Sequence, residues 1–252
     1  MFDLSNKLAL VTGSSRGLGN TLARALASAG AQVILHGRDL AALDRAADEW
    51  EVSYGTRPQT ILFDVQNAKS VETAILEIIE RFGTPDILVN NAGIQRRAPF
   101  AEFEVSDWDD IIATNLSSVF YVSRFIAPHM IARGSGKIIN IASVQSALGR
   151  QTIAPYTASK GGVALLTRGM TADLARHNIQ VNTLSPGYFA TDMNSALVAD
   201  EQFTTWLEQR TPAGRWGRPE ELAGALVFLA SPASDFVTGQ NIFVDGGMTA
   251  VV

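Results

Sequence analysis

Short apolar runs alternate with longer amphipathic segments from one end of the chain to the other. Each run is apolar at consecutive positions and is bounded by polar or turn-forming residues, which is typical of parallel strands buried on both faces. The predicted strands are Leu8–Thr12, Gln32–His36, Thr60–Phe63, Ile87–Val89, Lys137–Ile141, Ile179–Leu184 and Asn241–Val244.

Helical periodicity fills the intervals between these runs. The predicted helices are Gly17–Ala29, Leu40–Val52, Ala68–Phe82, Ser106–Ala132, Pro155–His177 and Pro219–Ala230. Strand–helix alternation predicts a Rossmann-type, doubly wound α/β sheet of about seven mostly parallel strands with helices on both faces. No linker or composition shift divides the chain, so we expect a single domain over residues 1–252. A less regular helical stretch, Thr191–Arg210, falls within a predicted lid segment at about 188–215.

Composition narrows the class of protein. The net charge is −5 and no basic run occurs, so we expect neither a nucleic-acid partner nor an anionic membrane surface. The chain contains no cysteine, and its first residues lack a signal-peptide pattern, which together favour a cytoplasmic location. No apolar run reaches the length of a membrane span.

A glycine-rich turn follows the first predicted strand and opens the first predicted helix. Gly13, Gly17 and Gly19 bracket Ser15 and Arg16 in this turn. Glycines let the backbone approach a pyrophosphate that rests on a helix N-terminus. The spacing differs from GxGxxG, and a turn without a ligand is the alternative, but the position after the first strand favours a dinucleotide.

The residues at the end of the second predicted strand indicate whether the dinucleotide is NAD or NADP(H). An NAD site usually places an acidic residue there, whereas this chain has Gly37 followed by Arg38. Arg16 and Arg38 together favour a 2′-phosphate, because guanidinium groups bind phosphate in a bidentate manner. The sequence therefore predicts NADP(H). The alternatives are a solvated Arg38 and a competing contribution from Asp39.

Two further strand ends carry polar side chains suited to the cofactor. Asp64 ends the third strand, where it either accepts from an adenine amino group or caps the next helix. Asn90, Asn91, Ala92 and Gly93 end the fourth strand and are placed to brace the cofactor and nearby backbone.

Candidate catalytic groups follow the fifth predicted strand. Tyr156 and Lys160 are four residues apart on a helix that starts at Pro155, so their side chains share one face. A nearby ammonium favours the phenolate, and we expect it to lower the pKa of Tyr156 from about 10. Ser143 can donate to a substrate oxygen as charge develops. Asn115 lies inside a predicted helix, where Asn is unfavourable unless it has a specific role.

With these residues in place, the chain resembles the short-chain dehydrogenase/reductase family over its whole length. The matching positions, in order, are Thr12–Gly19, Asp64, Asn90–Gly93, Asn115, Ser143, Tyr156, Lys160 and Pro186-Gly187. The resemblance implies that Tyr156 is the catalytic acid/base and that Lys160 lowers its pKa and holds the nicotinamide ribose. It also implies that Ser143 orients the substrate and that Asn115 supports a proton relay.

The resemblance also implies a set of cofactor contacts and an oligomeric state. The contacts are Gly13, Ser15, Arg16, Gly17, Leu18, Gly19, Arg38, Asp64, Val65, Asn91, Ala92, Gly93, Tyr156, Lys160, Pro186, Gly187 and Thr191. Members of the family form homotetramers built partly from the two long helices in the middle of the chain. The small residues there that suit close packing are Ala158, Ser159, Gly161, Gly162 and Ala164.

Several segments are similar to the members of that family that act on sugar acids. They are Asn90–Phe100, Ser143–Ser146, Leu148–Arg150, Arg176–Asn182, Pro186–Phe189, Arg210–Gly217 and Asp245–Met248. One departure is Ala147, where this group is expected to have Glu, so the identity of the sugar acid stays open.

The residues themselves also favour a small anionic substrate. Arg96 and Arg97 are adjacent after the fourth strand, where two guanidiniums can clamp a carboxylate. The alternative is a surface ion pair. Gln145 and Arg150 lie in the loop after Ser143 and are further candidates for substrate contact. Tyr188, Phe189 and Trp206 are candidates for an apolar lid edge, with core packing favoured for Trp206.

Other functions are kept as alternatives. His36, His129 and His177 do not fall at metal-ligand spacing, so we expect no metal site. A reductase of 3-oxoacyl thioesters or of another sugar or polyol would use the same catalytic residues. A non-catalytic NADPH sensor is less consistent with the presence of Ser143, Tyr156 and Lys160 together.

Overall fold

A computed structural model describes residues 1–191 and 194–252 of the chain. Seven parallel strands form one sheet in the order β3-β2-β1-β4-β5-β6-β7. Their bounds are β1 Leu8–Val11, β2 Gln32–Gly37, β3 Gln59–Leu62, β4 Ile87–Asn90, β5 Gly136–Ile141, β6 Ile179–Pro186 and β7 Asn241–Val244. The predicted doubly wound sheet of seven parallel strands is confirmed.

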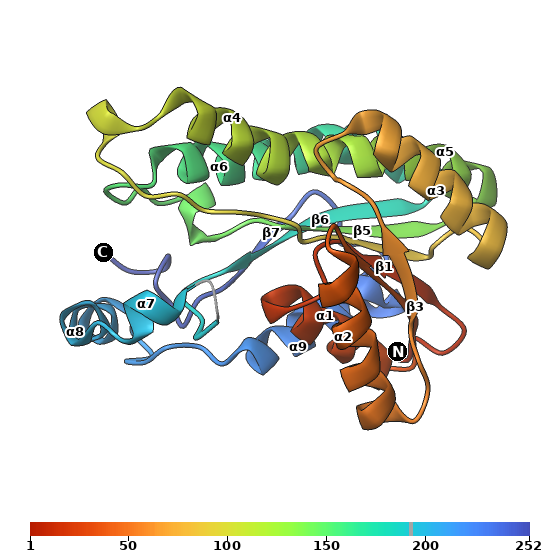
Figure 1. Ribbon diagram of the computed structural model, residues 1–252, viewed down its shortest axis with the longest axis horizontal. Coiled ribbons are helices and arrows are strands. Elements are labelled where there is room, and N and C mark those ends of the chain that lie inside the picture. Colours follow the sequence, from red (N-terminus) through yellow and green to blue (C-terminus); the bar gives the residue numbers. More distant parts are fainter. Residues whose placement is uncertain (192–193) are drawn as a thin grey trace.

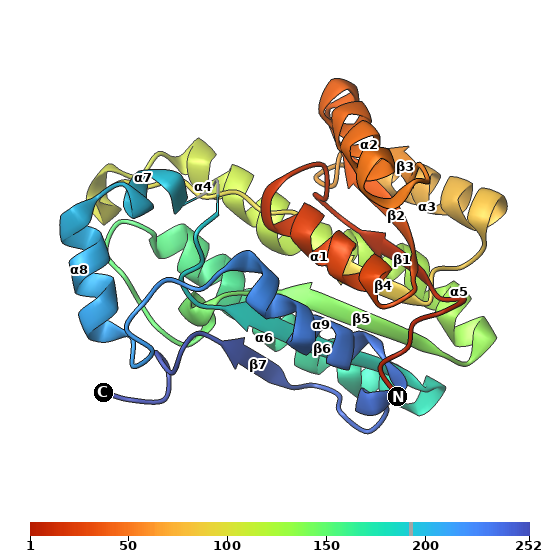
Figure 2. The same ribbon diagram turned by 90° about the horizontal axis from the view of Figure 1, so that it is seen from below.

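Helices cover both faces of this sheet (Figure 1). The helices that cover the sheet are α1 Gly17–Ser28, α2 Leu40–Tyr54, α3 Ala68–Phe82, α4 Val105–Ile112, α5 Ser118–Arg133, α6 Ala154–Leu174 and α9 Ala223–Ala230. Helices α1 and α9 lie side by side on the face of the sheet that is turned toward the viewer in Figure 2, and α3, α5 and α6 lie on the opposite face, above the sheet in Figure 1. None of the helices among the described residues is long and apolar enough to cross a membrane.

The alternation of side chains along the central strands supplies both faces with a core. In β1, Ala9 and Val11 pack with residues of α1, α2 and α9, while Leu10 packs with residues of α3 and α5. Successive side chains of a strand point to opposite faces, so each central strand stabilises two layers. The edge strand β3 departs from this pattern, because its Leu62 is 48% exposed.

The predicted helix Ser106–Ala132 is confirmed as a continuous helical stretch over residues 105–133, but its middle is a π-helical turn that the pattern did not predict. Helix α4 ends at Ile112, a π-helical turn spans Ala113–Ser117, and α5 begins at Ser118. A π turn inserts one extra residue into the helix and is often found at functional sites.

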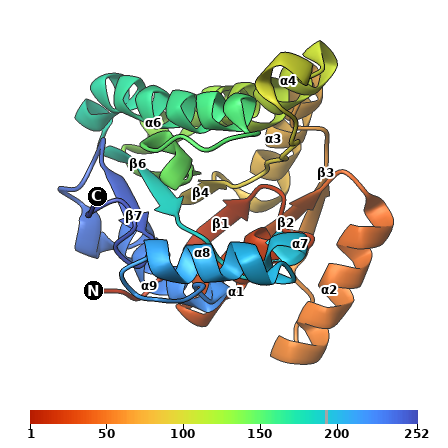
Figure 3. The ribbon, with the colours of Figure 1, turned by 90° about the vertical axis from the view of Figure 1, so that its left-hand side faces the viewer.

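Two further helices, α7 Ser195–Val198 and α8 Glu201–Arg210, follow β6. Figure 3 looks onto the carboxyl ends of the strands, and α8 crosses in front of them. Residues 192 and 193 of the predicted lid segment lie outside the described residues. In open parallel sheets, ligands bind beyond these carboxyl ends, where the strand order reverses. That reversal lies between β1 and β4.

Candidate active site

Ser143, Tyr156 and Lys160 come together at the carboxyl end of β5. Ser143 directly precedes a 3₁₀ turn, and its hydroxyl accepts a hydrogen bond from the Gln145 backbone at 3.2 Å. Tyr156 and Lys160 lie on successive turns of α6, as their spacing predicts. The Ser143 hydroxyl interacts with the hydroxyl of Tyr156, which places a proton donor beside the phenol.

Burial shifts the pKa values of Tyr156 and Lys160 in opposite directions. It raises the pKa of Tyr156 to about 12, against a smaller lowering by Ser143, and it lowers the pKa of Lys160 to about 8. The Lys160 ammonium donates to the Ile141 carbonyl at 2.7 Å and lies 5.7 Å from the centroid of the Tyr156 ring. The pKa of Tyr156 is therefore raised above 10 in this structure, and not lowered as expected, because loss of water around the phenol disfavours the phenolate. The Lys160 ammonium is directed at a backbone carbonyl.

Asn115 occupies the π-helical turn and is fully buried. Its side chain accepts from the Ile94 amide at 2.8 Å and donates to the Ile94 carbonyl at 3.0 Å. It also donates to the Ser159 hydroxyl at 3.1 Å, and that hydroxyl donates to the Tyr156 carbonyl at 2.7 Å. Asn115 thus joins the loop after β4 to the first turns of α6. This explains why an amide stands inside a helix.

The glycine turn requires close approach of the backbone. Gly13 has φ +64°, and a Cβ on it would lie 2.9 Å from the Cα of Ala92. A Cβ on Gly19 would lie 2.2 Å from the Gly13 carbonyl oxygen and 2.4 Å from the Asn91 amide nitrogen. Real Cβ atoms do not approach other atoms so closely, so these positions need glycine to leave a cradle at the start of α1.

The loop after β4 is tied directly to this glycine turn. The Asn91 side chain donates to the carbonyls of Thr12 at 2.9 Å and Gly13 at 3.1 Å. The Thr12 hydroxyl accepts from the backbone of Asn91 at 3.0 Å and of Ala92 at 3.1 Å. Asn91 therefore braces backbone across the strand-order reversal. Gly93 lies beside both Asn115 and Lys160.

His36 supports the glycine turn, a role that sequence reasoning missed. It is 3% exposed, its Nδ1 accepts from the Gly13 amide at 2.9 Å, and its Nε2 lies 3.1 Å from the Phe63 carbonyl. Because Nδ1 accepts, Nε2 carries the proton and donates, and the ring is neutral. Burial lowers the pKa of His36 to about 4. A signal existed in the sequence, since a polar residue ends an otherwise apolar strand.

The second strand end carries positive charge without a competing carboxylate. Arg16 and Arg38 are exposed, and neither guanidinium is hydrogen-bonded or ion-paired to any described residue. Asp39, the competing residue considered for this strand end, caps α2 by accepting from the Ala42 amide at 3.1 Å. A Cβ on Gly37 would lie 3.3 Å from the Ser15 side chain, so Ser15 adjoins the position where an NAD site carries its acid.

Asp64 is not the cap of α3. Its carboxylate accepts from the Gln66 amide at 2.9 Å, while Asn67 caps the helix by accepting from the amides of Lys69 and Ser70. The capping alternative for Asp64 is therefore wrong, and its exposed carboxylate adjoins the buried Val65.

The remaining candidate cofactor contacts surround the same crevice. Gly187 follows β6, and a Cβ on it would lie 2.7 Å from the Cα of Asp245. Pro186 is the last residue of β6, and Thr191 accepts through its carbonyl from the Asn194 amide at 2.9 Å. Leu18 packs in the first turn of α1.

The structure separates the two adjacent arginines. Arg96 pairs with Asp107 at 3.6 Å, so it forms the surface ion pair that was the alternative for this position. Arg97 instead faces Arg150 and Tyr188, and burial together with the charge of Arg150 lowers its pKa. Arg97 and Arg150 form no ion pair with a described residue. Gln145 is 6% exposed, and its amide oxygen is buried without a partner.

Four aromatic side chains border the crevice on the side of α8. Tyr188 lies 5.7 Å from Phe203, 6.2 Å from Trp206 and 5.9 Å from Trp216, measured between ring centroids. Trp206 is 44% exposed, so the expectation that it packs in the core is wrong. Phe189 is 4% exposed and belongs to the core, where a Cβ on Gly217 would collide with its ring; it does not form a lid edge.

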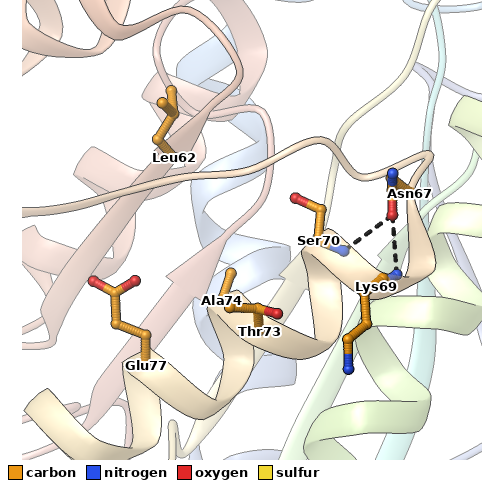
Figure 4. Close-up of a pocket in the computed structure, with 7 residues that line it drawn as sticks. All are labelled: Leu62, Asn67, Lys69, Ser70, Thr73, Ala74 and Glu77. Carbon is orange, nitrogen blue, oxygen red and sulfur yellow. Dashed lines mark hydrogen bonds between the residues drawn. The ribbon is translucent and has the colours of Figure 1, made fainter.

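Two concavities are found on the surface, and only one of them adjoins the aromatic cluster. One, of about 200 Å³, lies beside the aromatic cluster and is lined by Tyr188, Phe189, Thr211, Ala213, Arg215, Gly217, Glu221, Val244, Asp245 and Gly246. The other, of about 330 Å³, is an open hollow between Leu62 of β3 and one side of α3 (Figure 4). It contains none of the candidate site residues. Over residues 1–191 and 194–252 no group of three His, Asp or Glu side chains is arranged to hold a metal ion.

Comparison with known proteins finds one matching protein family and close relatives along nearly the whole chain. The family described as enoyl-(acyl carrier protein) reductase matches residues 13–249. Gluconate 5-dehydrogenase of Gluconobacter oxydans (strain 621H) is 56% identical over 249 residues, covering 99% of this chain and 97% of that protein. The 5-keto-D-gluconate 5-reductase of Escherichia coli (strain K12) is 51% identical over 252 residues, covering 100% of this chain and 99% of that protein.

A solved structure is similar along the whole chain. The gluconate 5-dehydrogenase of Burkholderia cenocepacia J2315, crystallised in complex with NADP and tartrate, superposes with a TM-score of 0.96. Its sequence is 55% identical, and the match covers 100% of this chain and 98% of that one.

Proposed function

Since the chain belongs to the short-chain dehydrogenase/reductase family, we propose that it is an NADP-dependent oxidoreductase that interconverts D-gluconate and 5-dehydro-D-gluconate. One observation carries this proposal. Tyr188 interacts electrostatically with both Tyr156 and Arg97, so the Ser143–Tyr156 contact lies near two guanidiniums, Arg97 and Arg150, that lack a carboxylate partner among the described residues. The crevice therefore offers a proton donor for a carbonyl oxygen and positive charge for an acid group.

Tyr156 is the acid/base of the reaction. In the reducing direction its hydroxyl gives a proton to the substrate oxygen, and in the oxidising direction its phenolate accepts that proton. Ser143 donates a hydrogen bond to the same oxygen and orients it. Lys160 stabilises the phenolate and holds the nicotinamide ribose, and Asn115 positions the loop after β4 and the start of α6.

The chain's residues fit NADP(H). Gly13 and Gly19 leave a cradle that a Cβ would fill, and it lies at the N-terminus of α1. Ser15, Gly17 and Leu18 continue that turn. Arg16 and Arg38 bind the 2′-phosphate, which no described carboxylate opposes. Bound NADP(H) supplies the hydride exchanged with the substrate carbon.

Further cofactor contacts follow from their positions around the same crevice. Asp64 and Val65 meet the adenine, and Asn91, Ala92 and Gly93 support the nicotinamide half. Pro186, Gly187 and Thr191 close the site on the side of β6.

Gln145, Arg97 and Arg150 recognise the sugar acid. The two guanidiniums bind the carboxylate, because charge-assisted bidentate contacts are the strongest hydrogen bonds available to such a group. Gln145 offers an unpartnered amide to a sugar hydroxyl. Arg96 contributes positive charge at the rim, while its guanidinium stays paired with Asp107.

We also propose a domain organisation, a lid segment and an oligomeric state for the whole molecule. Residues 1–252 form one domain, residues 188–215 act as a lid, and four copies assemble in the cytoplasm through the faces of α4, α5 and α6. Exposed apolar side chains on these helices and the absence of cysteine support this proposal.

A spectrophotometric assay of reduced nicotinamide tests the function. We expect reduction of 5-dehydro-D-gluconate with NADPH, a much lower rate with NADH, and little activity on acetoacetyl thioesters. The variant Arg97→Ala should raise KM for gluconate by about 100-fold, the effect of losing a charge-assisted contact, and leave KM for NADP nearly unchanged. Equal effects on the two KM values would contradict the carboxylate site, and faster turnover of the thioester would contradict the substrate.

A further inference from the structure

Arg150 connects the catalytic loop to helix α8. It lies between Ser143 and Tyr156 in the chain, and its guanidinium carbon is 4.7 Å from the centroid of the Phe203 ring. Phe203 belongs to α8, which crosses in front of the carboxyl ends of the strands (Figure 3). A guanidinium over an aromatic face at this distance is an attractive cation–π contact.

Phe203 is coupled to the rest of the lid segment. Its ring lies 5.2 Å from Trp206 on the same helix and 6.0 Å from Trp216 beyond it. The Trp216 indole donates to the Thr204 hydroxyl at 3.1 Å, which ties α8 to residues that follow it. A displacement of Phe203 should therefore be accompanied by a displacement of the whole of α8.

On its other side, Arg150 faces Arg97 across two tethered loops. The Ala98 amide donates to the Thr152 carbonyl at 3.1 Å, which fixes the loop after β4 against the loop that carries Arg150. Thr152 adopts φ +69°, a strained conformation for a β-branched residue. Such strain persists where the surrounding structure requires it. The hydrogen bond between the two loops keeps Arg97 and Arg150 close enough for their like charges to interact, and an anion between them would remove that repulsion.

We propose that Arg150 is a specificity-determining residue that binds the substrate carboxylate together with Arg97 and, through its contact with Phe203, couples that binding to closure of α8. The proposal rests on the proposed function, because it takes an acid as the substrate. The contact between Arg150 and Phe203 is already present in this structure, and an acid bound to Arg150 would hold the guanidinium, and with it α8, in that position. A neutral polyol or a thioester would leave the contact free to break.

Hydrogen–deuterium exchange on the NADPH complex tests this coupling without turnover. Gluconate added to the NADPH complex cannot be oxidised, so it reports binding alone. In the wild-type protein, gluconate at saturation should slow exchange of the amides of Glu201–Arg210 by about five-fold or more, a local change in opening. Exchange in α2, which lies away from the crevice, should stay unchanged.

Variants separate the two contacts of Arg150. Phe203→Leu keeps both arginines and should abolish protection of α8 while raising KM for gluconate about 3- to 30-fold, as expected for a lost cation–π contact. Phe203→Tyr retains an aromatic face and should restore both. Arg150→Gln should raise KM for gluconate by about 100-fold and abolish protection. Arg45→Gln, on the exposed face of α2, is the matched control and should change neither.

Protection of α8 in Phe203→Leu and Arg150→Gln equal to that in wild type, at saturating gluconate, would overturn the proposal. Failure of the proposed function gives a different result. If the wild-type protein does not oxidise gluconate but tartrate protects α8 in an Arg150-dependent manner, the coupling stands and the substrate is another acid. If neither acid protects α8 in the wild-type complex, the coupling is absent.

Discussion

At the scale of single residues, burial sets the chemistry of the site before any ligand is present. The same loss of water that raises the pKa of Tyr156 lowers that of Lys160, because it disfavours a phenolate and an ammonium alike. Each group in its charged form would stabilise the other. The pair is therefore arranged so that a change of charge on Tyr156 is compensated within the site.

We expect Tyr156→Phe to lower kcat by about 10²- to 10⁴-fold, the usual contribution of general acid–base catalysis. NADPH affinity, measured by nucleotide fluorescence, should change little, since the phenol ring remains. Because burial raises the pKa of Tyr156 to about 12, the hydroxyl stays protonated near neutrality. The rate of reduction of the keto acid should therefore stay constant near neutral pH, and the rate of oxidation of gluconate should increase as pH rises. Unchanged kcat in the variant would refute the role of Tyr156.

His36 gives the fold a dependence on acid pH. Its pKa is lowered from 6.5 to about 4 in the folded chain, so between these values the unfolded chain binds more protons. The contribution of neutral His36 to the free energy of unfolding is fully present above pH 6.5 and is lost as pH falls toward 4. The loss amounts to about 2 kcal/mol between pH 7 and 5. Urea unfolding should show a smaller loss over this interval in His36→Gln, and an equal loss in both proteins would contradict the assignment.

At the scale of elements, the apolar runs predict the sheet well because parallel strands are buried on both faces. The observed α3 and β7 have the bounds that the pattern predicts. The π turn at Ala113–Ser117 could not be predicted, since an extra residue in a helix leaves its apolar face nearly unchanged. Its signal was chemical rather than periodic: a buried amide, Asn115, that needed partners from another loop.

Contacts that depend on strand pairing were also beyond sequence reasoning. His36 reaches Gly13 because β2 lies beside β1 in the sheet, with Leu35 paired to Val11. Arg96 and Arg97 are neighbours in the chain, yet one pairs with α4 and the other faces the crevice. The residues of the Ser143, Tyr156 and Lys160 cluster were found because each follows a strand or shares a helix face.

The junction of β1 and α1 provides a prediction for an element. Gly19→Ala places a Cβ against the Gly13 carbonyl and the Asn91 side chain, so either the turn or α1 must move. We expect NADP affinity to fall by about 10-fold or more and the unfolding free energy to fall by about 1–3 kcal/mol, as in overpacked sites. Isothermal titration calorimetry and urea unfolding measure the two quantities.

Gly224→Ala is the matched control for that substitution. Gly224 lies in helix α9 with no atom within 4 Å of the added Cβ. Alanine there should stabilise the fold by about 0.5–1 kcal/mol, because it lowers the entropy lost on forming a helix. Similar losses in both variants would show that the close approach at Gly19 has no special role.

At the scale of the whole molecule, the surface is larger than a compact monomer requires. The accessible area is 11803 Å², whereas a compact chain of 27.0 kDa exposes about 10,800 Å². Part of the excess belongs to α7 and α8, which project beyond the sheet (Figure 1). Another part is apolar: Trp108 on α4, Phe120 on α5 and Leu165 on α6 are 43%, 50% and 65% exposed in the upper helix layer.

We expect this helix layer to be covered by a second copy of the chain in the proposed tetramer. Leu165→Asp should reduce the sedimenting species to dimers or monomers. In a two-fold symmetric interface both subunits contribute the substituted residue, so two carboxylates would be buried there. Leu40→Asp is the matched control: Leu40 is 59% exposed at the start of α2, where an acidic residue is tolerated. Sedimentation velocity at micromolar concentration distinguishes the species. A tetramer that persists in Leu165→Asp, or that dissociates equally in Leu40→Asp, would place the interface elsewhere.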